Sequence, residues 1–201
     1  MLFISDDYTE GWVDALRMID ENMPYRKECF YNALGQFEMT KHNEIKLAFE
    51  SIGAAPQSVN VLASGIALFL PTYLHEQGVD NIRLYDYDRQ AVELNWRINK
   101  HIPNLKQEAL DVIFDIEWID KDVDLVINQS CENMWHMKTT LNKYKPGTFF
   151  IFQSTFVPAK GRINVPSSLD QFIKSTGLSA HNVLYKKASK GMFTVMGNTN
   201  V

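Results

Sequence analysis

The sequence predicts an α/β protein, a three-layer sandwich with a seven-stranded, mostly parallel sheet. The first observation is that short apolar segments alternate with amphipathic segments along residues 57–201, which generates a parallel sheet with helices on both faces. The second is that the chain ends in two strand-like segments joined by a short turn, which predicts an antiparallel C-terminal hairpin. The third is the helical periodicity of residues 1–56, which predicts a helical N-terminal extension within one domain, 1–201.

The N-terminal extension is expected to contain three helices. Apolar residues recur three and four positions apart in the first and in the third. The first helix is expected to be capped by Thr9 and to end before Pro24, and a short second helix is expected within residues 25–36. The third is expected to be capped by Thr40 and to end at Gly53.

The sheet is expected to form from segments that are short, apolar and bounded by turn residues. Strands are predicted at residues 58–63, 81–85, 105–110, 123–128, 148–153, 181–186 and 192–197. Helices are predicted to begin, at residue types favoured in the N-cap or first turn, at Pro71, Asp88, Ser130 and Ser168. The helix after Ser130 is expected to be continuous, with Met134, Met137 and Leu141 on one face.

Composition and charge narrow the classes of function. The chain has 201 residues, a formal net charge of −4 and no apolar run of the ~20 residues that span a bilayer, so we expect neither a nucleic-acid-binding nor a membrane protein. Cys29 and Cys131 are too few for a disulfide framework or a four-ligand metal site. We therefore expect reduced thiols, no metal, no secretory signal and a cytoplasmic location. The oligomeric state stays open.

The order of the strands also predicts where a ligand binds. In open parallel sheets, ligands occupy the carboxyl ends of the strands, at the point where the strand order reverses. The expected site therefore lies in the segments that follow the first four strands, at residues 63–70, 86–88, 111–114 and 128–136.

The order of elements from Val59 to Gly197 resembles the Rossmann-like fold of the class I S-adenosylmethionine-dependent methyltransferases, whose last strand is antiparallel. The first turn, VNVLASGIA, resembles the family's VLDLGCGTG and keeps its central glycine as Gly65. Ala63 and Ala67 stand where the family has glycines, and an acid usual in the first strand is missing. The runs VDLVIN and YKPGTFFI resemble the family's fourth strand and the start of its fifth.

The resemblance implies S-adenosylmethionine as the cofactor. Asp86 ends the second strand about 20 residues after Gly65, where the family has an acid that accepts hydrogen bonds from the ribose hydroxyls. Asp111 follows the third strand, where members often have an acid that meets the adenine amino group. The cofactor-binding residues that the resemblance implies are Ala63, Ser64, Gly65, Asp86, Tyr87, Asp111, Val112 and Asn128. The same spacing to an acid occurs in NAD-binding folds, but those end in a parallel sixth strand.

Candidate residues for the chemistry lie after the fourth strand. Glu132 and His136 are candidate general bases, and because four residues separate them, they are expected to share a helix face. Trp135 is expected to form a flat wall for an acceptor or a cation. Tyr25 and Arg26, from the N-terminal extension, are expected to help define the acceptor pocket.

The preferred function is transfer of a methyl group to a small-molecule acceptor, because the chain leaves no separate domain for recognising a macromolecule. The run Ser64–Pro71, SGIALFLP, also resembles the first turn of nicotianamine synthase-like enzymes, which share the fold and transfer the aminocarboxypropyl group. A ligand-binding protein that has lost the chemistry is a further alternative, which the missing glycines favour. A nicotinamide-dependent oxidoreductase is opposed by the terminal hairpin and by the absence of G-x-G-x-x-G.

Overall fold

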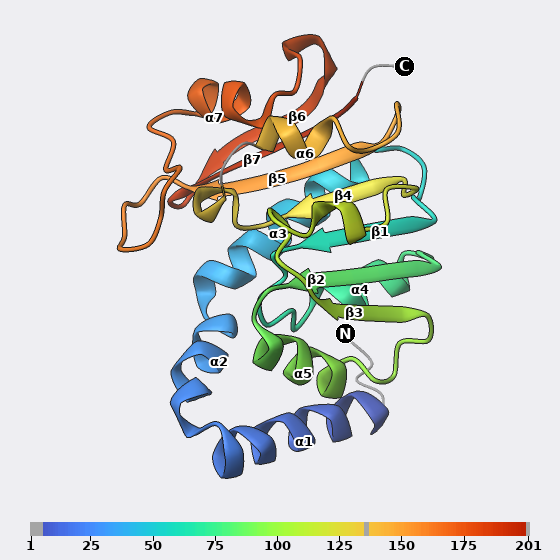
Figure 1. Ribbon diagram of the computed structural model, residues 1–201, viewed down its shortest axis with the longest axis vertical. Helices are drawn as coiled ribbons and strands as arrows, with labels where there is room; N and C mark the ends of the chain where they lie inside the picture. Colours follow the sequence, from blue (N-terminus) through green and yellow to red (C-terminus); the bar gives the residue numbers. More distant parts are fainter. Residues whose placement is uncertain (1–5, 135–136, 200–201) are drawn as a thin grey trace.

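The computed structural model describes residues 6–134 and 137–199, which form a seven-stranded sheet flanked by helices (Figure 1). The strands are β1 (Ser58–Leu62), β2 (Asn81–Asp86), β3 (Leu105–Ala109), β4 (Leu125–Asn128), β5 (Phe149–Thr155), β6 (Val183–Ser189) and β7 (Met192–Asn198). Their order is β3-β2-β1-β4-β5-β7-β6. Strands β1 to β5 are parallel, and β7 is antiparallel to both β5 and β6. The structure confirms the predicted sheet and its antiparallel C-terminal hairpin.

Helices connect most of the strands. The α-helices are α1 (Asp6–Asn22), α2 (Lys27–Ala33), α3 (Gln36–Glu50), α4 (Leu70–Glu76), α5 (Arg89–Ile98), α6 (Met137–Leu141) and α7 (Leu169–Thr176). The 3₁₀ helices are η1 (Pro24–Arg26), η2 (Ile116–Trp118), η3 (Cys131–Asn133) and η4 (Ala180–Asn182). Within the described residues, none of these helices has both the length and the apolar composition needed to cross a bilayer.

Different helices bury the two faces of the sheet. On one face, Phe49 of α3 and Leu74 of α4 pack in a cluster with Val61 of β1. On the other face, Met137 of α6 packs in a second cluster with Phe150 of β5, to which α7 also contributes. Burial of such side chains is worth about 1.5–3 kcal/mol each, so these two clusters are the main source of stability.

The first helix of the N-terminal extension runs along α5 at one edge of the molecule (Figure 1). Ile19 of α1 and Leu94 and Ile98 of α5 share a third apolar cluster. Gly11 lies where the two helices approach most closely, because a Cβ atom there would lie 2.5 Å from the carbonyl oxygen of Arg97. The contact between α1 and α5 therefore depends on a residue without a side chain.

Helix α3 is tied to the C-terminal hairpin by a buried carboxylate. Oε1 of Glu44 accepts hydrogen bonds from Nζ of Lys187 at 2.9 Å and from Oγ of Ser189 at 3.1 Å. Oε2 accepts a hydrogen bond from the hydroxyl of Tyr185 at 2.9 Å. Burial opposes ionisation of Glu44, but these contacts outweigh it and lower its pKa below the ordinary value. The ionised Glu44 therefore holds α3 against β6.

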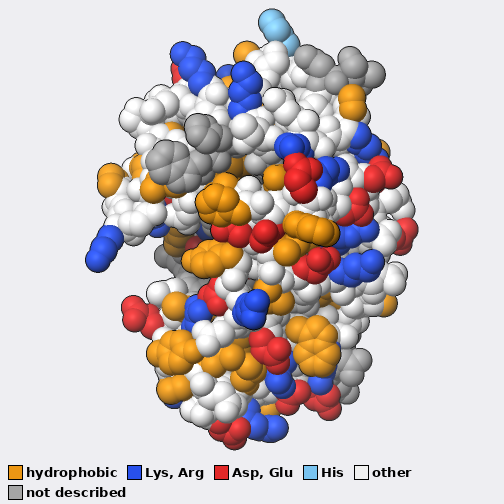
Figure 2. Space-filling model, in the orientation of Figure 1, with side chains coloured by type: hydrophobic (Ala, Val, Ile, Leu, Met, Phe, Trp, Pro, Cys, Tyr) orange, Lys and Arg blue, Asp and Glu red, His pale blue; other side chains and the backbone are white. Residues whose placement is uncertain are grey.

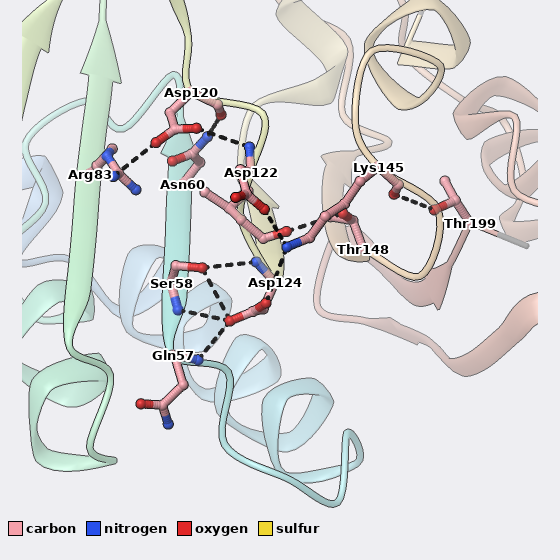
Figure 3. A network of polar contacts seen from close by, with 11 residues as sticks. Gln57, Ser58, Asn60, Arg83, Asp120, Asp122, Asp124, Lys145, Thr148 and Thr199 are labelled. Atoms are coloured by element: carbon pink, nitrogen blue, oxygen red, sulfur yellow. Dashed lines mark hydrogen bonds and ion pairs between the residues drawn. The ribbon is translucent and has the colours of Figure 1, made fainter. Parts of the chain in front are cut away.

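A second carboxylate aligns the amino ends of the strands, at the edge of the sheet away from their carboxyl ends (Figure 3). Oδ2 of Asp124 accepts hydrogen bonds from the N–H groups of Gln57 and Ser58, at 2.9 and 3.1 Å, and from the Ser58 hydroxyl at 3.1 Å. Nζ of Lys145 lies 3.7 Å from Oδ1. Partial burial raises the pKa of Asp124, but these donors and the charge of Lys145 lower it by more. The net pKa therefore lies below the ordinary value. Asp124 thus fixes the start of β1 beside the start of β4.

Two helix starts in the N-terminal extension differ from the sequence prediction. Helix α1 already includes Asp6, so Thr9 lies inside it instead of capping it. Helix α3 begins at Gln36, after Gly35 in an extended conformation. The hydroxyl of Thr40 donates to the carbonyl oxygen of Gln36 at 2.8 Å, the bond to the preceding turn that threonine makes when it lies inside a helix.

The continuous helix predicted after Ser130 is also wrong. The chain forms η3, then passes through Met134 in an extended conformation with φ −117° and ψ 146°, and α6 begins only at Met137. The side chain of Ser130 makes no capping hydrogen bond. Instead, the Ser130 N–H donates to Oδ1 of the buried Asn128 at 2.9 Å, which turns the chain directly after β4.

Candidate functional site

A cavity of about 730 Å³ opens at the carboxyl ends of the strands. It lies where β1 to β4 end, beside α2 and α3, and Figure 2 shows the hollow at this end of the molecule, on the left of the view. The strand order reverses between β1 and β4, so the cavity occupies the switch point expected for a ligand. The predicted site residues that line it are Arg26, Ala63, Ser64, Gly65, Asp86, Tyr87, Asp111 and Val112.

The turn after β1 forms the floor of the cavity. Ala63 has a φ of 49° and Gly65 a φ of 55°, both in the left-handed region. This conformation costs alanine about 1–2 kcal/mol, whereas glycine adopts it freely. No atom lies within 4 Å of the point where a Cβ of Gly65 would stand, so the space above the glycine is open. Alanine in place of glycine at position 63 therefore costs conformational energy.

Asp86, at the end of β2, is bonded directly to this turn. Its Oδ2 accepts a hydrogen bond from the Gly65 N–H at 2.7 Å, and its Oδ1 accepts one from the Asp88 N–H at 2.9 Å. Burial raises the pKa of Asp86 above the ordinary value, although these two bonds and the charge of Arg26 act in the opposite direction. The structure thus places a desolvated carboxylate beside the turn at the cavity wall.

A chain of polar contacts links this carboxylate to the N-terminal extension. Asp88 caps α5 by accepting hydrogen bonds from its first N–H groups, and its Oδ2 lies 2.6 Å from a guanidinium nitrogen of Arg26. Nε of Arg26 donates to Oε1 of Gln90 at 2.8 Å, and the Gln90 amide donates to the hydroxyl of Tyr25. Arg26 lines the cavity, whereas Tyr25 does not and is 64% exposed. Arg26 is therefore held at the cavity wall by Asp88.

The far end of the cavity is formed by the loop after β3. Asp111 lines it, and its Oδ1 accepts hydrogen bonds from the N–H groups of Ile113 and Phe114 at 2.9 and 3.3 Å. Val112 is buried and Tyr87 is largely exposed, and both line the cavity. The Asp111 carboxylate therefore holds its own loop in shape. Its remaining lone pairs can accept hydrogen bonds from a ligand in the cavity.

The loop after β4 presents different residues from those expected. Gln129, Ser130 and Asn133 line the cavity, whereas Asn128 and Glu132 do not. The Asn128 amide points inward and donates to Sδ of Met134 at 2.8 Å. Oε2 of Glu132 accepts a hydrogen bond from the Thr155 N–H at 3.3 Å, on β5. His136 and Trp135 lie outside the described residues.

Helices α2 and α3 add lining residues that the sequence did not reveal. Cys29 and Asn32 come from α2, and Glu38 and Lys41 come from α3. Nζ of Lys41 lies 3.2 Å from Oε2 of Glu38, and the Lys41 side chain is only 12% exposed. Their spacing of three residues on one helix marks them as a pair, but no local signal shows that the pair faces a ligand site. Within the described ranges, no group of His, Cys, Asp and Glu side chains is placed to hold a metal ion.

Comparison with known proteins gives a match at the level of structure only. No protein-family model and no curated protein matches the chain. The N-methyltransferase NodS from Bradyrhizobium japonicum WM9 is 12% identical, with a TM-score of 0.61 over 84% of this chain and 99% of NodS. NodS in complex with S-adenosylhomocysteine also matches, with 12% identity and a TM-score of 0.60 over 94% of this chain and 98% of NodS.

Two further methyltransferase structures match over most of their length. A SAM-dependent methyltransferase from Aquifex aeolicus is 16% identical, with a TM-score of 0.57 over 79% of this chain and 88% of that one. The ribosomal protein L11 methylase from Lactobacillus delbrueckii subsp. bulgaricus is 13% identical, with a TM-score of 0.57 over 79% and 80% of the two chains. Together with the strand order and the antiparallel β7, these likenesses show that the chain has the class I methyltransferase fold.

Proposed function

We propose that the protein binds S-adenosylmethionine and transfers its methyl group to a small-molecule acceptor. The observation that carries this proposal is the bond between the Gly65 N–H and the Asp86 carboxylate at the wall of the cavity. It joins a left-handed turn that leaves open space to an acid at the adjoining strand end, which is the arrangement that holds a nucleoside. The solved structures of the same fold include one with S-adenosylhomocysteine bound.

The residues present fit such a cofactor. A volume of about 730 Å³ lies within the usual range for ligand sites. Ser64 lines the cavity, and its buried Oγ has no hydrogen-bond partner among the described residues. Asp86 would accept hydrogen bonds from the ribose hydroxyls, and Asp111 would meet the adenine amino group, as the fold resemblance implies.

The chemistry would depend on positioning. S-adenosylmethionine, when bound, supplies an electrophilic methyl group on its sulfonium. The protein's part is to orient the acceptor in line with that group and to exclude water. Gln129, Ser130 and Asn133 are placed to orient an acceptor, because they line the cavity after β4. Where the acceptor must lose a proton, Glu38 is the carboxylate that α3 contributes to the cavity.

A small polar molecule is the acceptor that the cavity favours. Helices α2 and α3 and the loop containing Lys160 and Gly161 border it, so the acceptor would share a half-open cleft with the cofactor. Its lining carries the Glu38–Lys41 ion pair and several amides, which suit an acceptor with polar groups. We propose a cytoplasmic location for this reaction, which the free cysteines Cys29 and Cys131 support.

Calorimetry and product analysis test this function. Titration with S-adenosylmethionine, S-adenosylhomocysteine and NAD is expected to give binding of the two sulfur nucleosides only. Mass spectrometry of a reaction with pooled small metabolites is expected to show S-adenosylhomocysteine together with a product heavier by one methylene. Release of methylthioadenosine would instead identify aminocarboxypropyl transfer, and binding without any product would contradict the transferase assignment.

A further inference from the structure

The turn at Gly65 is held from behind by a buried carboxamide on α5. Nδ2 of Asn95 donates to the carbonyl oxygen of Gly65 at 2.7 Å, and Oδ1 of the same side chain accepts a hydrogen bond from the Ala67 N–H at 2.7 Å. Asn99, one turn further along the helix, donates from Nδ2 to the carbonyl oxygen of Ala67 at 3.1 Å. Both asparagines are fully buried. Side chains of α5 thus supply hydrogen-bond partners to backbone groups of a loop outside the strand ladder.

Further hydrogen bonds hold the N–H groups of the turn. The Ser64 N–H donates to the carbonyl oxygen of Tyr85 at 3.1 Å, and the Gly65 N–H is taken by Asp86. These groups therefore point into the protein. The hydroxyl of Ser64 is buried and has no hydrogen-bond partner in the described structure, and Ser64 lines the cavity. The network therefore fixes the backbone of the turn at the cavity wall.

We propose that Asn95 is the positioning residue of the ligand-binding turn and that it acts through Gly65 and Ser64. The inference rests on the proposed function, because the ligand is the proposed cofactor. The turn needs such support, since Ala63 adopts a left-handed φ that alanine disfavours and only one glycine is present in it. An amide is required, because the side chain must donate to a carbonyl and accept from an N–H at once. Aspartate could only accept when ionised, and leucine could do neither.

The test compares two substitutions at neighbouring positions of α5. Asn95→Leu removes both hydrogen bonds to the turn. Leu94→Ala, the matched control, creates a cavity in the apolar cluster that also contains Leu68, but it keeps both hydrogen bonds of Asn95 to the turn. Below the melting temperature of both variants, Asn95→Leu is expected to weaken S-adenosylhomocysteine binding at least tenfold. Leu94→Ala is expected to keep the affinity within about threefold, although it too lowers the melting temperature.

Asn95→Asp serves as the second variant, should Asn95→Leu not fold. It keeps the acceptor for the Ala67 N–H, loses the donor to Gly65, and is expected to weaken binding at least fivefold. Hydrogen exchange of residues 63–70, measured without ligand, is expected to accelerate more in either Asn95 variant than in Leu94→Ala, which keeps the hydrogen bonds of Asn95 to the turn. Unchanged affinity together with unchanged exchange in an Asn95 variant would overturn the proposal. If the unaltered protein binds no sulfur nucleoside, the proposed function fails, and the exchange result alone decides the role of Asn95.

Discussion

The N–H of Gly65 donates a hydrogen bond to Oδ2 of Asp86 at 2.7 Å, although 21 residues separate the two in the sequence. The bond joins the carboxyl ends of β1 and β2, which pair in parallel from Ser58 and Asn81 onward. It orients the carboxylate before any ligand arrives, so a ligand does not have to order it. The cavity wall is therefore preorganised at the two positions that the proposed cofactor needs most.

Asp86→Ala is expected to weaken S-adenosylhomocysteine binding at least tenfold, about 1.4 kcal/mol. The substitution removes the proposed acceptor for the ribose hydroxyls and the partner of the Gly65 N–H. Asp80→Ala is the matched control, because Asp80 is exposed and lies just before the opposite end of β2. Isothermal titration calorimetry measures both variants. Equal affinity in Asp86→Ala and Asp80→Ala would show that the ribose is placed incorrectly.

Ligand affinity is expected to fall as the pH is lowered. Burial raises the pKa of Asp86, so its carboxylate is protonated at a higher pH than that of an exposed aspartate. The protonated group accepts hydrogen bonds less well, so the dissociation constant is expected to rise as the pH falls toward this raised pKa, at a higher pH than an exposed aspartate would give. Asp86→Asn cannot titrate and is expected to bind weakly with a flatter profile. A flat profile in the unaltered protein would contradict this role for Asp86.

The fold was predictable because its main signals are local. The strand Leu125–Asn128 is buried along its whole length, so it reads as a continuous apolar run. The caps of α5 and α7 were also correct, because Asp88 and Ser168 accept hydrogen bonds from N–H groups of the turns that follow. Thr40 misled the prediction, because threonine is common at caps and yet bonds to the preceding turn inside α3. The choice between these two uses depends on tertiary packing, which a local pattern does not contain.

Gly11→Ala is expected to lower stability by about 1–3 kcal/mol. The higher helix propensity of alanine would by itself raise stability by about 1 kcal/mol. The sign of the measured change in stability therefore shows whether the steric clash or the propensity dominates. The new Cβ would lie 2.5 Å from a backbone oxygen of Arg97, which forces α1 away from α5. Thermal denaturation followed by circular dichroism measures the change, with the exposed Glu21→Ala on the same helix as the control. A higher melting temperature in Gly11→Ala would show that the two helices do not pack as described.

Asp124→Asn is expected to lower stability at neutral pH by about 1–2 kcal/mol, because three donors lose an ionised acceptor. The pKa of Asp124 is lowered in the folded protein, so its contribution is complete above the unfolded pKa and disappears as the pH falls through the folded one. The two proteins should therefore converge in stability as the pH falls below the folded pKa of Asp124. Urea denaturation at a series of pH values measures this convergence. Asp122→Asn is the control, because the Asp122 side chain is more exposed than that of Asp124. A difference that persists in acid would contradict an electrostatic role.

The site was predictable only where it follows the strand ends. Gly65 lies in the turn after β1 and Asp86 is the last residue of β2, so the topology alone brings them to the cavity. Asn95 and Lys41 contribute from the sides of helices, and which side faces the cavity depends on packing across the whole molecule. Glu132 was expected at the site but does not line the cavity. It lies in η3 instead of a continuous helix, and its carboxylate accepts a hydrogen bond from β5. Residue spacing identifies neighbours on a helix but not the direction in which they point.

Calorimetric titration of the unaltered protein with S-adenosylhomocysteine tests the central claim most directly. One ligand is expected to bind per chain, to be displaced by S-adenosylmethionine, and to raise the melting temperature, because a ligand that binds only the folded state stabilises it. NAD at the same concentration is expected to give no heat and no shift. Absence of heat and of a thermal shift with both sulfur nucleosides at millimolar concentration would contradict the assignment of this cavity.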